Sequence, residues 1–129
     1  MEDKRRPLRE AELLEHERLV ELFPAFPHFA VRHAIDNEAL PADLFSVRAR
    51  VLLGEAKKED AAAYASGLLI GADVRIGLSI PTGAQIAVVG RPELTKLYAA
   101  AIATTGRDVV EHDGEACFLA GINEIAKRI

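Results

Sequence analysis

The chain has 129 residues, of which 50% are hydrophobic and 28% are charged, and its formal net charge is −4. This length accommodates one domain with its own core, while the acidic balance and the aromatic content of 5% argue against a nucleic-acid-binding surface. Cys117 is the only cysteine, which excludes an intrachain disulfide and is typical of a cytoplasmic protein, and no apolar signal core follows the basic N-terminus.

The first predicted element is a charged amphipathic helix over Leu8–Phe23. Acidic and basic residues alternate there around four leucines, which leaves one apolar side. Such a helix either packs on that side and is otherwise solvated, or binds a partner. Pro24 and Pro27 end it, because proline interrupts helical hydrogen bonding.

Two histidines and two carboxylates follow close together and raise the question of a metal site: His28, His33, Asp36 and Glu38. A metal site needs three or four ligands that converge on one point, and the spacing of these residues does not provide such an arrangement. We therefore expect surface helix residues here and no metal.

Two helices are predicted in the segment from these histidines to Gly54, the first glycine of the chain. The first is short and ends at Pro41; its apolar residues are Phe29, Val31, Ile35 and Leu40. The second covers Asp43–Gly54, with Gly54 as its stop. Its inward-facing residues are predicted to be Leu44, Val47 and Val51, with Phe45 and Leu52 as further candidates.

A long helix is predicted over Ala61–Leu78. The surrounding apolar stretch, Tyr64–Ile80, contains charged residues and glycines, so it indicates a buried helix rather than a membrane span. Small residues recur every fourth position, at Ala63, Gly67 and Gly71. Because a glycine inside a helix costs about 1 kcal/mol relative to alanine, this face predicts either tight packing against another helix or the close approach of a ligand.

The segment Ile86–Ile102 predicts a buried strand, a glycine turn and an amphipathic helix. Ile86–Val89 is a short apolar run after a turn at Pro81–Gly83, and Gly90 stops it. Pro92 suits the first position of a helix, and Gly106 suits a left-handed C-cap. This arrangement is either an ordinary connection or one that presents backbone amides and a helix N-terminus to a ligand.

A second strand is predicted over Asp108–Glu111, parallel to the first because a helix connects the two. The last helix begins at Asp113–Glu115, where capping and favourable helix-dipole interactions explain the carboxylates better than a catalytic pair does. Its buried stripe is predicted to be Phe118, Ile122, Ile125 and Ile129. We expect Cys117 to be a buried small hydrophobic residue.

Four successive blocks resemble the C-terminal half of the 2-dehydro-3-deoxygalactonokinase family, which are sugar-acid kinases of the actin-like ATPase superfamily. These blocks are LFSVRARVLLG, YASGLLIGADV, IAVVGRPELTKLYAAAI and VVEHDGEACFLAGINEIA. The resemblance covers Leu44–Ile129 and divides the chain into an unmatched helical extension, residues 1–41, and a nucleotide-side lobe, residues 42–129.

The resemblance implies an α/β fold, one ribonuclease-H-like lobe with a small, mainly parallel sheet and four or five helices. It also implies transfer of phosphate from ATP to the 6-hydroxyl of 2-dehydro-3-deoxygalactonate in galactonate breakdown, with magnesium as cofactor. The residues that match the family's nucleotide side are Gly67, Gly71, Gly90, Arg91, Pro92, Glu115, Ala116, Ala120 and Gly121.

The superfamily's Asp-x-Gly-Thr phosphate hairpin is absent from this sequence. Because phosphoryl transfer depends on charges positioned around the phosphates, the chain alone is expected to be inactive, with the magnesium ligands in a missing lobe. The expected partners are an adenine nucleotide and either that complementary lobe or a second copy of the chain, but neither nucleic acid nor a membrane. The competing hypothesis is a non-enzymatic protein-interaction module.

Overall fold

The structure is a computed structural model that describes residues 28–80 and 85–129. In these residues five helices and two strands follow the order α2 (His28–Asp36), α3 (Leu40–Leu52), α4 (Lys58–Ser79), β1 (Ile86–Gly90), α5 (Pro92–Ala103), β2 (Val109–Asp113) and α6 (Gly114–Ala126). The small α/β architecture with a parallel sheet is therefore confirmed. The helix predicted over Leu8–Phe23 and the turn predicted at Pro81–Gly83 lie outside the described residues.

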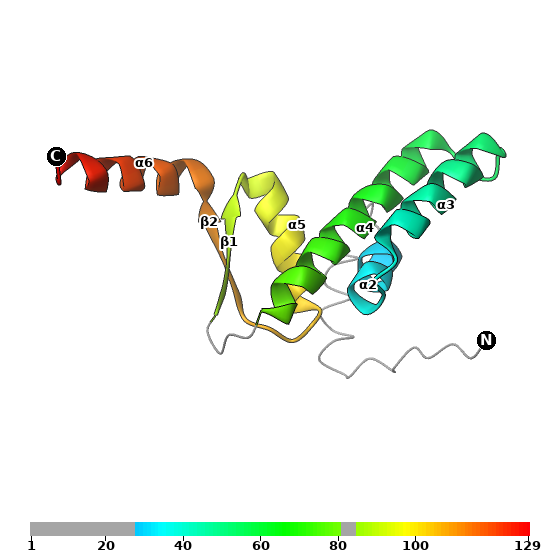
Figure 1. The fold of residues 1–129 in the computed structure, drawn as a ribbon, viewed down its shortest axis with the longest axis horizontal. Coiled ribbons are helices and arrows are strands. Elements are labelled where there is room, and N and C mark those ends of the chain that lie inside the picture. The colour runs from blue at the N-terminus through cyan, green and yellow to red at the C-terminus, as the bar shows by residue number, and fades with distance from the viewer. Residues whose placement is uncertain (1–27, 81–84) are drawn as a thin grey trace.

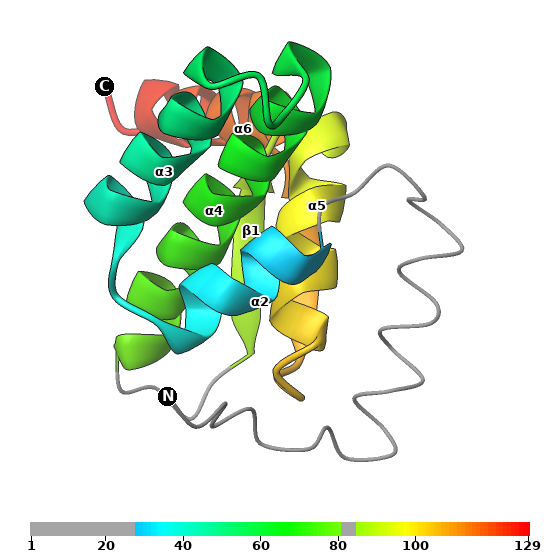
Figure 2. The ribbon, with the colours of Figure 1, turned by 90° about the vertical axis from the view of Figure 1, so that its right-hand side faces the viewer.

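The long helix α4 lies at the centre of the fold, with α2 and α3 on one side and α5 on the other (Figures 1 and 2). Its buried residues are Gly67, Leu68, Ile70, Gly71 and Val74. By length and composition α4 could also cross a membrane. Here it is the shared packing partner of three other helices, which accounts for its apolar sequence.

Pro41 begins a helix rather than ending one, which corrects the sequence prediction. The helix α2 stops at Asp36, and α3 starts at Leu40 with Pro41 in its first turn, where the missing amide hydrogen is tolerated. Phe45 and Leu52 are 73% and 75% exposed, so they do not belong to the inward face. The boundary predicted at residue 41 falls inside α3, and the division into extension and lobe stays a prediction.

The two strands form a parallel sheet whose register runs from Ile86 opposite Val109 to Gly90 opposite Asp113. The helix α5 connects them and packs on one face of the sheet (Figure 1). Gly106 follows α5 with a φ of +77°, which confirms the predicted left-handed residue at this end. The alternating side chains Ile86 and Val88 join the core formed by α4 and α5, as half-buried strand residues do.

The last helix, α6, projects away from the rest of the molecule (Figure 1). It has no buried residue, and the predicted stripe residues Phe118, Ile122 and Ile125 are 66%, 47% and 62% exposed. The prediction of a buried stripe is therefore wrong for this chain, and so is the prediction that Cys117 is buried. The helical spacing is as predicted, but no described element covers it.

Candidate functional site

The most distinctive site candidate is the edge of the sheet where both parallel strands end. Gly90 ends β1 and lies opposite Asp113, the last residue of β2. Each strand passes directly into a helix, because α5 begins at Pro92 and α6 at Gly114. Open α/β sheets bind ligands beyond the carboxyl ends of their strands, where helix N-termini present partial positive charge.

This edge carries two glycines, Gly90 at the end of β1 and Gly114 at the start of α6. Gly90 does not have a positive φ, and a Cβ there would lie 3.5 Å from the Cγ2 atom of Thr95, which is ordinary contact. A Cβ on Gly114 would lie only 3.1 Å from the Cα atom of Gly90. A side chain at position 114 would therefore push the two strand ends slightly apart.

The sequence analysis did not select Gly114, although a signal for it was present. Gly114 directly follows the last residue of β2, and Gly90 is the last residue of β1. A glycine at each of two neighbouring strand ends is typical of close backbone approach. The register that pairs Gly90 with Asp113, and so brings Gly114 beside Gly90, comes from the tertiary structure.

The N-termini of α5 and α6 differ in what occupies them. On α6, the carboxylate of Asp113 accepts hydrogen bonds from the amides of Glu115 at 2.9 Å and Ala116 at 3.2 Å. This confirms the predicted capping role. On α5 the cap residue is Arg91, whose side chain makes no capping bond and is exposed. The N-terminus of α5 therefore has no carboxylate cap, unlike that of α6, and the exposed Arg91 lies beside it.

Thr95 fixes α5 to the sheet below this edge. Its side chain is buried, with 3% of the residue exposed, and its hydroxyl donates to the carboxylate of Glu111 on β2 at 2.8 Å. The carbonyl of Pro92, at 3.3 Å, is a second and longer acceptor. A buried hydroxyl with a charged acceptor holds the first turn of α5 in position.

The candidate nucleotide-site residues do not all gather at one place. Gly90, Arg91, Pro92 and Glu115 lie at the strand ends, whereas Gly71 faces α2. A Cβ on Gly71 would lie 2.8 Å from the Cβ atom of Ala34 and would collide with the carbonyl oxygen of Val31. Close helix packing, one of the two predicted explanations, therefore accounts for Gly71.

The remaining matched residues are split between α4 and α6. Gly67 is buried one turn before Gly71 on α4. Gly121 lies on α6 together with Ala116 and Ala120, all exposed, and a Cβ on Gly121 would meet nothing within 4 Å. Position 121 therefore has room for a side chain, whereas positions 71 and 114 do not.

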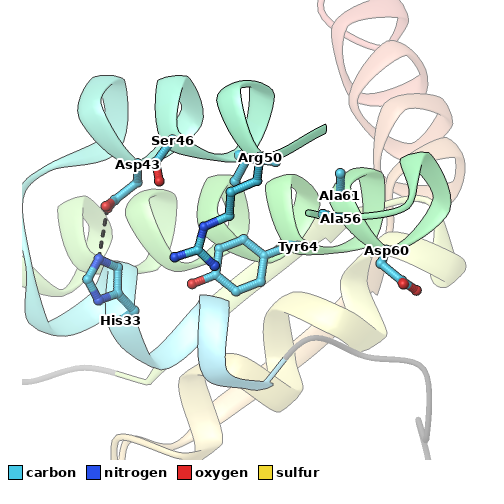
Figure 3. A pocket seen from close by; sticks show the side chains of 9 residues that line it. His33, Asp43, Ser46, Arg50, Ala56, Asp60, Ala61 and Tyr64 are labelled. Carbon is cyan, nitrogen blue, oxygen red and sulfur yellow. Dashed lines mark hydrogen bonds and ion pairs between the residues drawn. The ribbon is translucent and has the colours of Figure 1, made fainter. Parts of the chain in front are cut away.

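A second concave feature lies between α3 and α4, where an open cavity of about 320 Å³ is lined by Ser46, Arg50, Asp60 and Tyr64 among others (Figure 3). At one end the Nε2 atom of His33 lies 2.9 Å from a carboxylate oxygen of Asp43. This pair joins α2 to α3. The cavity is far from the strand ends in sequence and uses none of the matched residues.

The carboxylates that raised the question of a metal site bind other partners. Asp36 accepts from Arg32 at 3.0 Å, and Glu38 pairs with Arg75 at 3.3 Å. Across residues 28–80 and 85–129, no three histidine, cysteine or acidic side chains come together in a group that could hold a metal ion. The first contact lies within α2, and the second attaches the loop after α2 to α4.

A polar contact also joins α4 to α5. The hydroxyl of Tyr98 donates to the carboxylate of Asp73 at 2.7 Å. Desolvation, together with the neighbouring carboxylate, raises the pKa of Tyr98 to about 12. This contact joins the middle of α5 to α4, so it helps to hold the helix whose first turn borders the candidate site.

Comparison with known proteins gives a consistent result. Residues 8–125 match the family described as 2-keto-3-deoxy-galactonokinase. The 2-dehydro-3-deoxygalactonokinase of Escherichia coli is 33% identical over 100 residues, which are 77% of this chain and 34% of that protein. A crystal structure of a Sinorhizobium meliloti protein named as a 2-dehydro-3-deoxygalactonokinase matches with a TM-score of 0.66 and 34% identity over 81% of this chain and 35% of that one.

The chain therefore spans about a third of the length of these relatives. The family match begins at residue 8, so it also includes most of the segment that the sequence analysis left unmatched.

Proposed function

The chain belongs to the 2-keto-3-deoxy-galactonokinase family, and we propose from this premise that it forms the nucleotide-side part of a kinase that phosphorylates 2-dehydro-3-deoxygalactonate at its 6-hydroxyl with ATP. The match over residues 8–125 carries the proposal. The finer fold assignment, one ribonuclease-H-like lobe of the actin-like ATPase type, belongs to the same proposal. So does a cytoplasmic location, which agrees with a single, unpaired cysteine.

The residues at the strand ends fit an adenine nucleotide. The backbone at Gly90 is not covered by a side chain of its own, so the flat face of a purine or a ribose can approach it closely. The first turn of α5 has no side-chain cap, and the guanidinium group of Arg91 is exposed beside it. The exposed arginine favours an anionic group, although Glu93 in the first turn of the same helix carries the opposite charge. Pro92 and Glu115 border this surface.

Two of the matched glycines fit the proposed site less well. The space beside Gly71 is filled by α2, so we leave this residue out of the site. Gly121 stays in the proposal because α6 starts at the same edge and nothing described covers it.

Bound ATP with magnesium supplies the transferable phosphoryl group and neutralises its charge. What this chain supplies is the surface that binds and orients the nucleotide. The magnesium ligands and the phosphate-cradling hairpin belong, in this proposal, to a complementary lobe. We therefore expect the chain alone to bind an adenine nucleotide without catalysing phosphoryl transfer, and to turn over the sugar acid only when that lobe is added.

The proposal is tested by calorimetric titration of the chain with ATP, comparing the parent with Gly90→Val. A valine side chain would cover the bare backbone, so the affinity for ATP should fall by about tenfold or more, as expected when a close contact is blocked. Gly77→Val is the matched control, because this glycine lies on α4 and a Cβ there meets nothing within 4 Å.

Equal ATP affinity in the Gly90→Val variant and the parent would place the site elsewhere. The thermal midpoint of each variant must be measured as well, since a loss of fold would imitate a loss of binding. If the folded parent binds no adenine nucleotide at all, the competing hypothesis is favoured. This is a non-enzymatic interaction module, and the exposed apolar residues of α6 are the observation that supports it.

A further inference from the structure

The side chain of Thr95 lies below the strand ends and faces both strands. Thr95 is 3% exposed, and among the described residues it is the buried polar one. Its hydroxyl donates to the carboxylate of Glu111 on β2 at 2.8 Å. Its Cγ2 atom lies 3.5 Å from the point that a Cβ atom on Gly90 of β1 would occupy. One side chain of α5 is therefore placed against both strands near the edge of the sheet.

Glu111 stands on the face of the sheet that α5 covers. Side chains alternate between the two faces along a strand, so Glu111 shares its face with Val109, which packs against the core that includes α4 and α5. Glu111 is an exposed residue, so water alone would satisfy its carboxylate. The bond to Thr95 instead holds this carboxylate against α5, and a hydrogen bond to a charged acceptor is about twice as strong as one between neutral groups.

Thr95 also connects this bond to the residues of the proposed nucleotide site. Its backbone amide donates to the carbonyl of Arg91 at 2.9 Å, which closes the first turn of α5. Arg91 and Pro92 border the site from the β1 side, and Glu115 borders it from the β2 side, where α6 begins. The bond between Thr95 and Glu111 thus joins the first turn of α5 to the strand that carries the other border.

We propose that Thr95 is a positioning residue of the strand-end site, with Glu111 as its acceptor. The pair sets the orientation of α5 relative to β2, so it sets how well the two borders of the site fit one adenine nucleotide. Thr95 is too deeply buried to touch the nucleotide itself, so it acts through Gly90 and the first turn of α5. This inference rests on the proposed function, since it assigns a role within the same site.

Loss of the Thr95 hydroxyl should weaken binding in a protein that is still folded. Binding residues keep a productive geometry only where neighbouring hydrogen bonds and packing hold them. Thr95→Val keeps the branched shape and the methyl group that faces Gly90, but it removes the donor to Glu111. We expect the affinity for ATP to fall about threefold to tenfold, which is the size of coupling found between residues of one hydrogen-bond network.

The first experiment is calorimetric titration of the parent, Thr95→Val and Thr95→Ser with ATP, at a temperature well below each thermal midpoint. There nearly all of the protein is folded, so a change in stability alone leaves the affinity unchanged. Thr95→Ser keeps the hydroxyl and should bind ATP nearly as well as the parent. Thr104→Val is the matched control, because it removes a hydroxyl that donates to the carbonyl of Ala101 at the opposite end of α5.

The second experiment compares Glu111→Ala with Glu111→Gln. Both variants lose the negative charge, but only glutamine keeps an oxygen that can accept the hydrogen bond from Thr95. Glu111→Ala should therefore bind ATP about threefold more weakly than Glu111→Gln, and this difference should disappear in chains that also carry Thr95→Val. Because Glu111 is exposed, these variants leave no cavity and test the proposal even if Thr95→Val does not fold.

Equal ATP affinity in Thr95→Val and the parent would overturn the positioning role and leave the proposed function intact. The same conclusion would follow from an equal loss of affinity in Thr104→Val, or from equal affinities in the two Glu111 variants. A folded parent chain that binds no ATP would overturn both proposals, and the parent alone shows this result. Weaker binding in Thr95→Val together with retained binding in Thr95→Ser and Thr104→Val is the expected outcome.

Discussion

The two glycine-containing apolar helices α4 and α6 have opposite environments. In α4, five residues are buried, and α2, α3 and α5 all pack against it. In α6 no residue is buried, although its sequence is just as apolar and its N-cap is well formed. The comparison shows that an apolar helical pattern predicts a face that can be buried. Whether that face is buried depends on the rest of the chain or on another molecule.

The largest expected difference between the two helices concerns leucine. Leu68 on α4 is 0% exposed, and Leu119 on α6 is 53% exposed. Leu68→Ala should lower the free energy of unfolding by about 2–5 kcal/mol, because it leaves a cavity in the core. Leu119→Ala should change it by less than about 0.5 kcal/mol. Urea denaturation measures both, and equal effects would contradict the contrast between the helices.

The next comparison is between a glycine of α4 and a glycine of α6. Gly71→Ala forces a methyl group against Val31 and Ala34, so we expect a loss of about 1–3 kcal/mol in the free energy of unfolding. Gly121→Ala meets open space and gains helix propensity, so helical content should rise slightly. Thermal unfolding followed by circular dichroism tests both variants. A tolerated Gly71→Ala would mean that α2 can move away from α4 at little cost.

The same test distinguishes the two glycines of the strand ends. Gly114→Ala would bring a methyl group to 3.1 Å from the Cα atom of Gly90, so it should destabilise the protein by about 1 kcal/mol. Gly90→Ala makes only an ordinary contact of 3.5 Å with Thr95 and should be tolerated better. Chemical denaturation of the pair decides which glycine the close approach requires; the reverse ranking would show that the strand ends lie farther apart.

The cap of α6 should matter more than a cap on a well-packed helix. Asp113→Ala removes both hydrogen bonds to the first turn, which costs about 1 kcal/mol at a typical N-cap. Because packing contributes little to α6, this loss should reduce helical content and speed amide exchange within α6 while α4 stays protected. Hydrogen exchange resolved by residue provides the measurement, with unchanged exchange in α6 as the contrary result.

The smallest expected effect is the pH dependence of the contact between α4 and α5. The pKa of Tyr98 is raised from 10.0 to about 12 in the folded protein. The unfolded state therefore loses this proton first, and the contribution of Tyr98 to stability is present below pH 10 and declines between pH 10 and 12. Tyr98→Phe should remove this part of the alkaline slope in denaturation midpoints. An identical slope in the variant would assign it to other groups.

Local sequence signals were sufficient for the elements and several of their ends. Apolar spacing located α4, β1, α5 and β2, and the left-handed Gly106 and the cap Asp113 were identified from residue type. They were not sufficient where a residue fits more than one place in the fold. Pro41 was assigned to the end of one helix when it begins the next, because a proline breaks the chain before it and suits the turn after it.

The candidate site was predictable only in part, for a similar reason. The turn at Gly90 follows from a strand, a glycine and a helix in succession. The importance of Gly114 depends on the register that sets Asp113 opposite Gly90, and the role of Gly71 depends on which helix lies over it. Thr95 and Glu111 carry no local signal for their hydrogen bond, because 16 residues separate them.

The sequence by itself determined the periodicity of each element, the small parallel sheet and the family to which the chain belongs. These properties depend on neighbouring residues or on the order of sequence blocks along the chain. The tertiary structure decided which apolar faces are covered. Burial is a property of two surfaces, and the sequence of one helix describes only its own. The apolar stripe of α6 and the small-residue face of α4 were both predicted from helical spacing. In the structure α2 packs on the face of α4, whereas no described element covers the stripe of α6.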